Sequence, residues 1–154
     1  MKFTEATKTC LKKYFQMSGR ASRSEYWWFL LAIVIATVIA ALMDLMLFDA
    51  SKNIDGSGPI EGIVGLVLII PNFTASIRRL HDTNRSGWYL LAPLAGLMFA
   101  IFVGKMIGPT LGQGGPIIVG IIMILSFLLP IWWQTRPSDP NPNKFGPNPN
   151  EVPS

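Results

Sequence analysis

Charged residues are scarce in this chain of 154 residues, and four long stretches of it contain none. Asp, Glu, Lys and Arg together account for 14% of the residues, whereas an average soluble domain has about 25%. The uncharged stretches are 26–43, 62–77, 88–104 and 106–135. Apolar runs of this length are typical of helices that cross a bilayer, so the composition excludes an ordinary soluble domain.

The chain also has only one cysteine, Cys10, and one histidine, His81. A single cysteine excludes an intramolecular disulfide, and this pair is too small a set for a Cys/His metal cluster. The glycines of 112–115 follow no predicted strand, so they do not form a phosphate-binding or dinucleotide-binding loop. We therefore predict no metal and no cofactor. The net charge of +4 flanks apolar segments, which favours an anionic lipid surface over nucleic acid.

The apolar runs predict an all-α membrane protein that forms one domain over 1–154. Its four transmembrane helices are expected over 22–48, 60–78, 87–108 and 116–135. At about 1.5 Å per residue, helices of this length reach across a hydrocarbon core of about 30 Å. Polar or glycine-rich turns are expected over 49–58 and 109–115, and Pro71 should kink the second helix. Neighbouring polar side chains should then satisfy the carbonyl that this proline frees.

The two ends of the chain differ in character. Residues 1–21 predict a basic amphipathic helical segment, which either lies in the membrane interface or packs on the rest of the protein. Residues 136–154 contain six prolines and four asparagines, which predicts an extended tail without regular helix. Between them, Ser22 and Glu25 have the spacing of a capping box at the start of the first membrane helix, and an aromatic belt follows at Tyr26.

Lys and Arg are unevenly divided between the two sides that four crossings create. Six precede the first helix, three lie between the second and third helices, and two lie in the tail, which gives eleven on one side. The other side has only Lys52 and Lys105. The positive-inside rule assigns the side with eleven to the cytoplasm, so we expect both termini to be cytoplasmic.

The segment between the second and third helices, 78–88, holds the densest set of polar residues. Asp82 lies four residues after Arg78 and three after Arg79, so it shares a face with both if the second helix continues. Arg85 follows three residues later. Asp82 is therefore expected to order several guanidinium groups.

Three interpretations of this segment stay open. The first is a topology signal combined with an ion-paired turn. The second is a phosphate or headgroup site, in which arginine forks and Ser86 supply donors. The third is a catalytic site with His81 as acid or base and Ser22 or Ser86 as nucleophile. Adjacent His81 and Asp82 do not form a triad-like pair and no nucleophile motif is present, so we assign no catalytic residue.

Three motifs resemble the signatures of one family. They are 19–27 (GRASRSEYW), 78–82 with 85–88 (RRLHD and RSGW), and 143–149 (NKFGPNP). In this order they are similar to those of the bacterial inner-membrane family called domain of unknown function 805. The resemblance implies a multi-pass protein of the bacterial inner membrane and supplies no activity. Because all three motifs lie on the predicted cytoplasmic side, we hypothesise that they meet there, with Asn143 and Phe145 folded over the arginines.

The leading functional hypothesis is a non-enzymatic membrane protein whose basic cytoplasmic face binds anionic lipid headgroups or a protein partner, which includes a second copy of the chain. The candidate binding residues are Arg20, Arg23, Arg78, Arg79, His81, Asp82, Arg85 and Ser86. The residues expected to shape the motifs are Ser22, Glu25, Trp27, Gly87, Trp88, Asn143, Phe145 and Gly146.

Two alternatives belong to other classes. One is a small oligomeric transporter or channel subunit that depends on Asn72 or Asp44. The other is an enzyme that acts on lipid phosphates and depends on His81. Asp44 and Lys105, near the predicted outer interface, are expected to pair with each other or to reach the headgroups.

Overall fold

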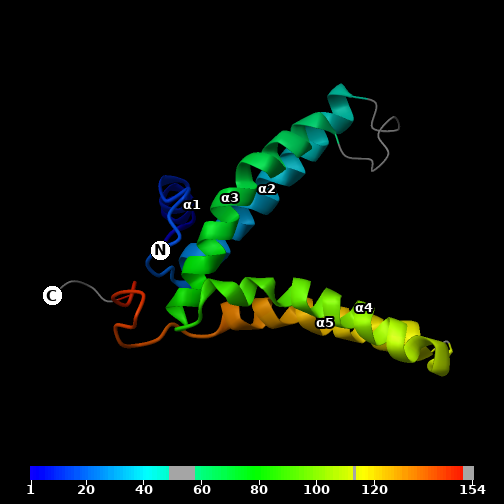
Figure 1. Cartoon of the computed structure of the whole chain (residues 1–154). Coiled ribbons are helices and arrows are strands. Elements are labelled where there is room, and N and C mark those ends of the chain that lie inside the picture. Colours follow the sequence, from blue (N-terminus) through cyan, green and yellow to red (C-terminus); the bar gives the residue numbers. More distant parts are fainter. Residues whose placement is uncertain (49–57, 113, 151–154) are drawn as a thin grey trace.

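The computed structural model describes residues 1–48, 58–112 and 114–150, and within them the long elements are all helices. Four of these helices form two antiparallel hairpins (Figure 1). The first hairpin pairs α2 (Arg23–Leu47) with α3 (Pro59–Asp82), and the second pairs α4 (Ala92–Leu111) with α5 (Gly114–Thr135). The hairpins meet where α2 begins and α3 and α5 end, and they diverge beyond that point. We call this meeting point the vertex.

The predicted fold class is confirmed, because four helices are long and apolar enough to cross a membrane. Their bounds differ in detail from the expected ones. Helix α3 continues to Asp82, and the third span opens with a 3₁₀ helix, η2 (Gly87–Leu91), before α4. Helix α4 runs through Pro109, where a turn was expected. The expected turn at 49–58 lies outside the described residues except for Gly58.

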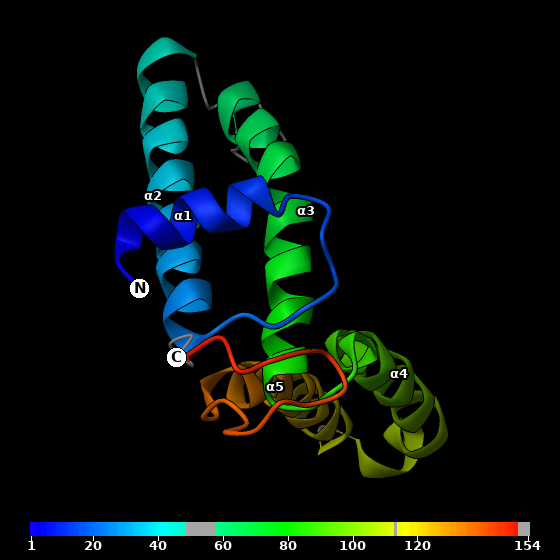
Figure 2. The ribbon, with the colours of Figure 1, turned by 90° about the vertical axis from the view of Figure 1, so that its left-hand side faces the viewer.

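A short fifth helix, α1 (Phe3–Lys12), lies across α2 and α3 (Figure 2). Its Ala6 and Cys10 are fully buried, and its Phe3 ring meets Trp28 of α2 edge-on. Cys10 joins a small apolar core with residues of α2 and α3. Of the two interpretations of this segment, the structure therefore shows packing against the protein.

The linker after α1 resolves the backbone problem that Pro71 creates. Proline has no N–H, so the carbonyl of Val67, four residues earlier in α3, loses its helical donor. The hydroxyl of Tyr14 donates a hydrogen bond to this carbonyl. The hydroxyl of Thr74 donates in turn to the carbonyls of Tyr14 and Pro71, each at 3.1 Å. Polar side chains thus satisfy the interrupted backbone, and they fasten the linker along α3.

Asp44 closes the first hairpin at the end far from the vertex. Its buried carboxylate accepts hydrogen bonds from the backbone N–H groups of Ile60 and Glu61, at 3.0 and 2.7 Å. These are the first turn of α3, whose own N-cap, Gly58, offers no side chain. The expectation that Asp44 pairs with Lys105 or reaches the headgroups is wrong, because the carboxylate is a helix cap supplied by a neighbouring helix.

The second hairpin is held by close packing of small residues. A Cβ atom added at Gly96 of α4 would collide with the side chain of Ser126 of α5. Glycine here lets the two backbones approach, as is common for helices packed in membranes. Most large apolar side chains of α4 and α5 face outward and are exposed, which suits a bilayer as their surroundings.

Candidate functional site

The vertex brings together the three motifs that the sequence singles out. The linker before α2, the end of α3 and the tail after α5 lie side by side there (Figure 2). The backbone N–H of Ala21 donates to the carbonyl of Arg78 at 3.0 Å, and the N–H of Asp139 donates to the carbonyl of Asp82 at 2.9 Å. The hypothesis that these motifs meet is therefore confirmed by direct contacts.

Arg20 is the residue that joins all three motifs. Its Nε donates to Asp82 Oδ1 at 3.0 Å. Its two terminal nitrogens donate to the tail carbonyls of Asp139, Asn141 and Gly146, at 2.6, 2.9 and 3.3 Å, and weakly to the carbonyl of Asp82. The side chain is 1% exposed, so every donor of this guanidinium is used inside the protein.

Arg79 joins the end of α3 to the end of α5, as Arg20 joins α3 to the tail. It forms an ion pair with Asp82, and its other nitrogens donate to the carbonyls of Gln134 and Arg136. Gln134 lies in the last turn of α5, where backbone carbonyls have no helical donor. A cation at this position also suits the negative end of the helix dipole. Asp82 thus orders two guanidinium groups, as its spacing to Arg79 suggests.

Arg78 points elsewhere, because adjacent residues of a helix face different directions. It pairs with Glu25 of α2 and also approaches Cys10 Sγ at 3.7 Å. The expected sharing of Asp82 by Arg78 is therefore wrong. The expected capping box is also only half formed. Ser22 accepts from the N–H of Glu25 at 3.2 Å, but the Glu25 carboxylate turns to Arg78 instead of back to Ser22.

The described part of the tail contains no helix, as expected, and Asn143 and Phe145 fold back over the end of α3. The N–H groups of Asn143 and Gly146 each donate to the carbonyl of the other, which closes a tight turn with Gly146 at φ +132°. The Asn143 amide donates to the carbonyl of His81 at 2.9 Å. The Phe145 ring stacks on the His81 ring, with centroids 3.7 Å apart and planes 3° from parallel.

We call Arg20, Arg78, Arg79, Glu25 and Asp82 the buried arginine cluster. Three guanidiniums face two carboxylates there, and the extra positive charge lies against backbone carbonyls. Burying charge is costly unless each group is paired and hydrogen-bonded, and this cluster meets that condition nearly throughout. Arg78 Nε is the one buried cluster atom for which the described residues provide no partner. The cluster therefore holds the fold together and offers few donors to a ligand.

A second set of arginines lies at the surface of the vertex. We call Arg23, Arg85 and Arg136 the arginine rim; Arg23 and Arg136 are exposed and Arg85 is half-buried. Within the described residues, no carboxylate lies within ion-pair distance of these three side chains. Arg136 lies over the Trp132 ring at 4.3 Å and Arg85 over Trp133 at 5.7 Å, so both lie beside the aromatic end of α5.

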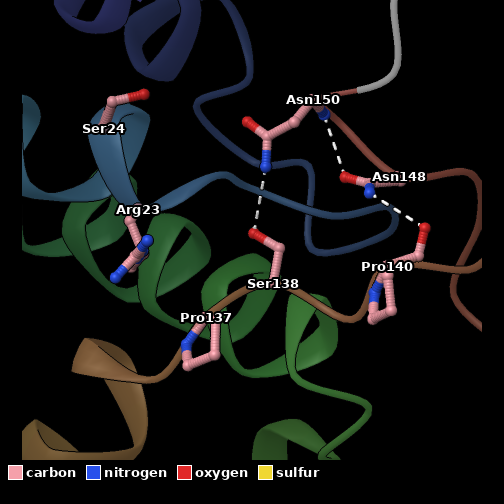
Figure 3. Close-up of a pocket in the computed structure, with 7 residues that line it drawn as sticks. All are labelled: Arg23, Ser24, Pro137, Ser138, Pro140, Asn148 and Asn150. Carbon is pink, nitrogen blue, oxygen red and sulfur yellow. Dashed lines mark hydrogen bonds between the residues drawn. The ribbon is translucent and has the colours of Figure 1, made fainter.

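The rim borders two hollows that share the tail segment 137–140. One, of about 510 Å³, lies between Arg23, Ser24 and the folded tail (Figure 3). The Asn150 amide donates to the Ser138 hydroxyl across it. The other, of about 310 Å³, is bordered by Arg85 and Arg136. Asp139 also borders this second hollow.

The remaining candidate residues lie around these two sets. Ser86, Gly87 and Trp88 open η2 and border a separate cavity, and Trp27 is exposed at the start of α2. Sequence reasoning missed Ser138, whose hydroxyl donates to Asp82, and it counted Arg136 only as a topology charge. The position of Arg136 beside two tryptophans was a usable signal. Ser138 carried none, because its partner is 56 residues away.

Four apolar helices long enough to span a membrane form two hairpins, and the buried arginine cluster joins them at the vertex. This arrangement defines an integral membrane protein. Comparison with known proteins then identifies the family. The model of the family described as "Protein of unknown function (DUF805)" matches residues 14–147, so the chain belongs to this family, as the motifs suggested. No solved structure matches the chain at a significant level.

Two relatives from Escherichia coli K12 are both called inner membrane proteins. The first, YhaH, is 32% identical over 143 residues, which are 93% of this chain and 94% of YhaH. The second, YhaI, is 35% identical over 97 residues, which are 63% of this chain and 73% of YhaI.

Proposed function

We propose that this protein resides in a bacterial inner membrane with its vertex in the cytoplasm, and that the arginine rim binds the headgroups of anionic phospholipids. The observation that carries the proposal is that the three rim guanidiniums have no carboxylate partner among the described residues and lie beside lipid-facing helices. Arg85 donates one hydrogen bond, to the carbonyl of Thr83 at 3.2 Å. The guanidinium groups of Arg20, Arg78 and Arg79 bind other groups of the protein, so we no longer include these three arginines in the proposed site. The site that we propose consists of Arg23, Arg85 and Arg136.

The position of the rim favours a lipid phosphate over other anions. Trp132 and Trp133 mark the end of α5, and tryptophan is typical of the headgroup level of a bilayer. Guanidinium groups match phosphate geometry, and cations near the anionic cytoplasmic leaflet contribute about 1 kcal/mol each to membrane binding. The cytoplasmic placement is supported by the eleven Lys and Arg residues on the vertex side of the spans.

The experiment compares binding of phosphatidylglycerol and phosphatidylcholine with the same acyl chains, by native mass spectrometry of the protein in neutral detergent. The test variant carries Arg23→Gln, Arg85→Gln and Arg136→Gln. The control carries Lys8→Gln, Lys12→Gln and Lys13→Gln, which remove the same charge from α1 and the linker after it. We expect the rim variant to lose its preference for phosphatidylglycerol by about 100-fold, from about 1 kcal/mol per cation.

The control should change that preference less than threefold. Equal losses in both variants would contradict the proposal, because they would show a general charge effect instead of a site. A wild-type protein without any preference for phosphatidylglycerol would also contradict it.

Most residues on which the two alternatives depended have other contacts. Asp44, named for transport, caps α3. His81, named for catalysis, is stacked on Phe145, and its Nδ1 lies 3.2 Å from the carbonyl of Gly19. Ser22 caps α2.

An exception is Asn72, also named for transport, whose buried Oδ1 has no hydrogen-bond partner among the described residues. A single amide oxygen does not form a transport pathway, so headgroup binding is the function that we propose.

A further inference from the structure

A second concave site lies at the vertex, where η2 leaves α3. It is a cavity of about 350 Å³ that shares no lining residue with the Arg85 hollow. Ligand sites in proteins begin at roughly this size. The residues that line it come from the linker before α2, from α3, and from η2; they are Met17, Phe73, Ile77, His81, Ser86, Gly87, Trp88 and Leu91.

The cavity has an apolar wall and a polar end. Phe73, Ile77 and Leu91 form the wall within the two spans. At the polar end, the described residues provide no hydrogen-bond partner for the Ser86 hydroxyl. A carbonyl oxygen can only accept, so the contact with Gly19 places the proton of neutral His81 on Nδ1. Nε2 is then left as an acceptor.

The close approach of η2 to α3 shapes this cavity. A Cβ atom at Gly87 would lie 3.0 Å from the Ile77 side chain, so glycine lets the chain pass at this distance. The next residue, Trp88, is 79% exposed. A large indole that borders a cavity at the end of a membrane span belongs at the headgroup level, where its apolar body meets lipid.

Positive charge lies near the polar end. Phe145 covers one face of His81, and the Lys144 ammonium lies 5.0 Å from the centroid of the Phe145 ring. The tail turn thus places an exposed lysine near the hydrogen-bonding groups of the cavity. The cavity therefore has an apolar wall within the spans, hydrogen-bonding groups at the end of the spans and a cation nearby. A phospholipid has its acyl chains, ester groups and phosphate in the same order.

We propose that this cavity binds one phospholipid of the surrounding bilayer, with the start of an acyl chain against Phe73, Ile77 and Leu91. Ser86 donates to the ester carbonyl, and Lys144 lies near the phosphate. The bound lipid lies between the second half of α3 and η2. This site is independent of the arginine rim and does not require an anionic headgroup beyond the phosphate itself.

The test fills the cavity with a larger side chain. Leu91→Trp places an indole in the wall, whereas the control Leu94→Trp changes an exposed residue of α4 that does not line the cavity. Each protein is washed extensively in detergent, and retained phospholipid is measured by native mass spectrometry. We expect the wild type and the control to retain one phospholipid, and Leu91→Trp to retain at least tenfold less. Equal retention by both variants would overturn the proposal.

A second measurement decides the matter if Leu91→Trp fails to fold. A photoreactive benzoylphenylalanine replaces Phe73 in one protein and the exposed Phe99 of α4 in another. After the same wash, irradiation should crosslink phospholipid at position 73 at least tenfold more than at position 99. Equal yields, or crosslinks to detergent alone, would overturn the proposal. Retention by the triple rim variant separates this site from the proposed headgroup site, because loss at the rim leaves the cavity intact.

Discussion

The side chain of Arg79 contacts the backbone of Arg136, yet the guanidinium groups of these two residues have different surroundings. Arg79 is fully buried and donates to the backbone carbonyl of Arg136, while the side chain of Arg136 is exposed over Trp132. The same contrast holds between the whole buried arginine cluster and the whole arginine rim. Guanidinium groups of the same region therefore either hold the folded segments together or lie at the protein surface.

The difference lies in what surrounds each guanidinium. In the cluster, carboxylates and unpaired backbone carbonyls use the donors, and removal of one partner leaves a buried charge uncompensated. On the rim, water and lipid can reach the donors, so each residue adds little to stability and stays available to a ligand. Variants of the two sets should therefore affect different measurements.

The largest effect is expected for Asp82→Asn. This change removes the carboxylate that both Arg20 and Arg79 contact, and it leaves two buried cations without their counter-charge. We expect the free energy of unfolding to fall by about 3–5 kcal/mol, measured by denaturant titration in mild detergent. Asp139→Asn is the matched control, since that carboxylate contacts only a tail N–H among the described residues. A loss below about 1 kcal/mol for Asp82→Asn would refute the structural role of the cluster.

Arg79→Lys should have the next largest effect. It keeps the charge but replaces a planar fork with a single ammonium, which cannot reach Asp82 and the carbonyls of Gln134 and Arg136 at once. We expect a loss of about 1–3 kcal/mol and faster trypsin cleavage after Lys144, because the tail is released. Arg136→Lys should leave both quantities unchanged. If the two lysine variants behave alike, the distinction between the cluster and the rim is wrong.

Cys10 reports on the cluster through its chemistry. Burial, and then the negative charge of Glu25, raise the pKa of its thiol to about 11 from an ordinary value near 9. At pH 8 the folded protein should therefore contain about 100-fold less thiolate than an ordinary thiol, and it should react with maleimide at least that much more slowly. The comparison protein carries Cys10→Ser with Ser18→Cys, at an exposed position.

The same shift has a consequence for stability. The unfolded thiol loses its proton near pH 9 and the folded one near pH 11, so the unfolded state gains stability across this interval. The contribution of Cys10 is fully present below pH 9 and is lost as the pH rises toward 11. Rapid labelling of Cys10 in folded protein at pH 8 would show that α1 does not pack against α2 and α3 as described.

The smallest effect on stability is expected for Arg23→Gln. This residue is exposed and has no carboxylate partner among the described residues, so the unfolding free energy should change by less than about 0.5 kcal/mol. The same denaturant titration measures it. If the unfolding free energy falls by more than about 1 kcal/mol, Arg23 stabilises the fold as the buried arginine cluster does. Headgroup binding would then need another site.

Much of the fold could be predicted, because helices that cross a bilayer need long apolar segments and these segments are continuous in the sequence. The four spans, the helical segment at the start and the Ser22 cap all depend on neighbours a few residues away. The pairing of Asp82 with Arg79 was accessible for the same reason. The pairing of Asp82 with Arg20 was not, because these residues lie 62 positions apart.

The errors have the same origin. Arg78 was assigned to Asp82 by spacing, but a buried Glu25 on another helix competes for it. The tail was expected to lack helix and to fold over the arginines, but its composition did not indicate that Arg20 contacts three of its carbonyls. Asp44 was expected to pair with Lys105 or to reach the headgroups, although it caps a helix that begins 15 residues later.

The sequence by itself determined that this protein crosses a membrane four times and carries its distinctive polar motifs at one end of the spans. Hydrophobicity and local spacing suffice for that, because they act within a single helix. Only the tertiary structure decided which guanidinium groups are buried and paired with carboxylates, and which lie at the surface without a carboxylate partner. That division depends on burial and on carboxylates and carbonyls brought together from distant segments, and packing alone determines both.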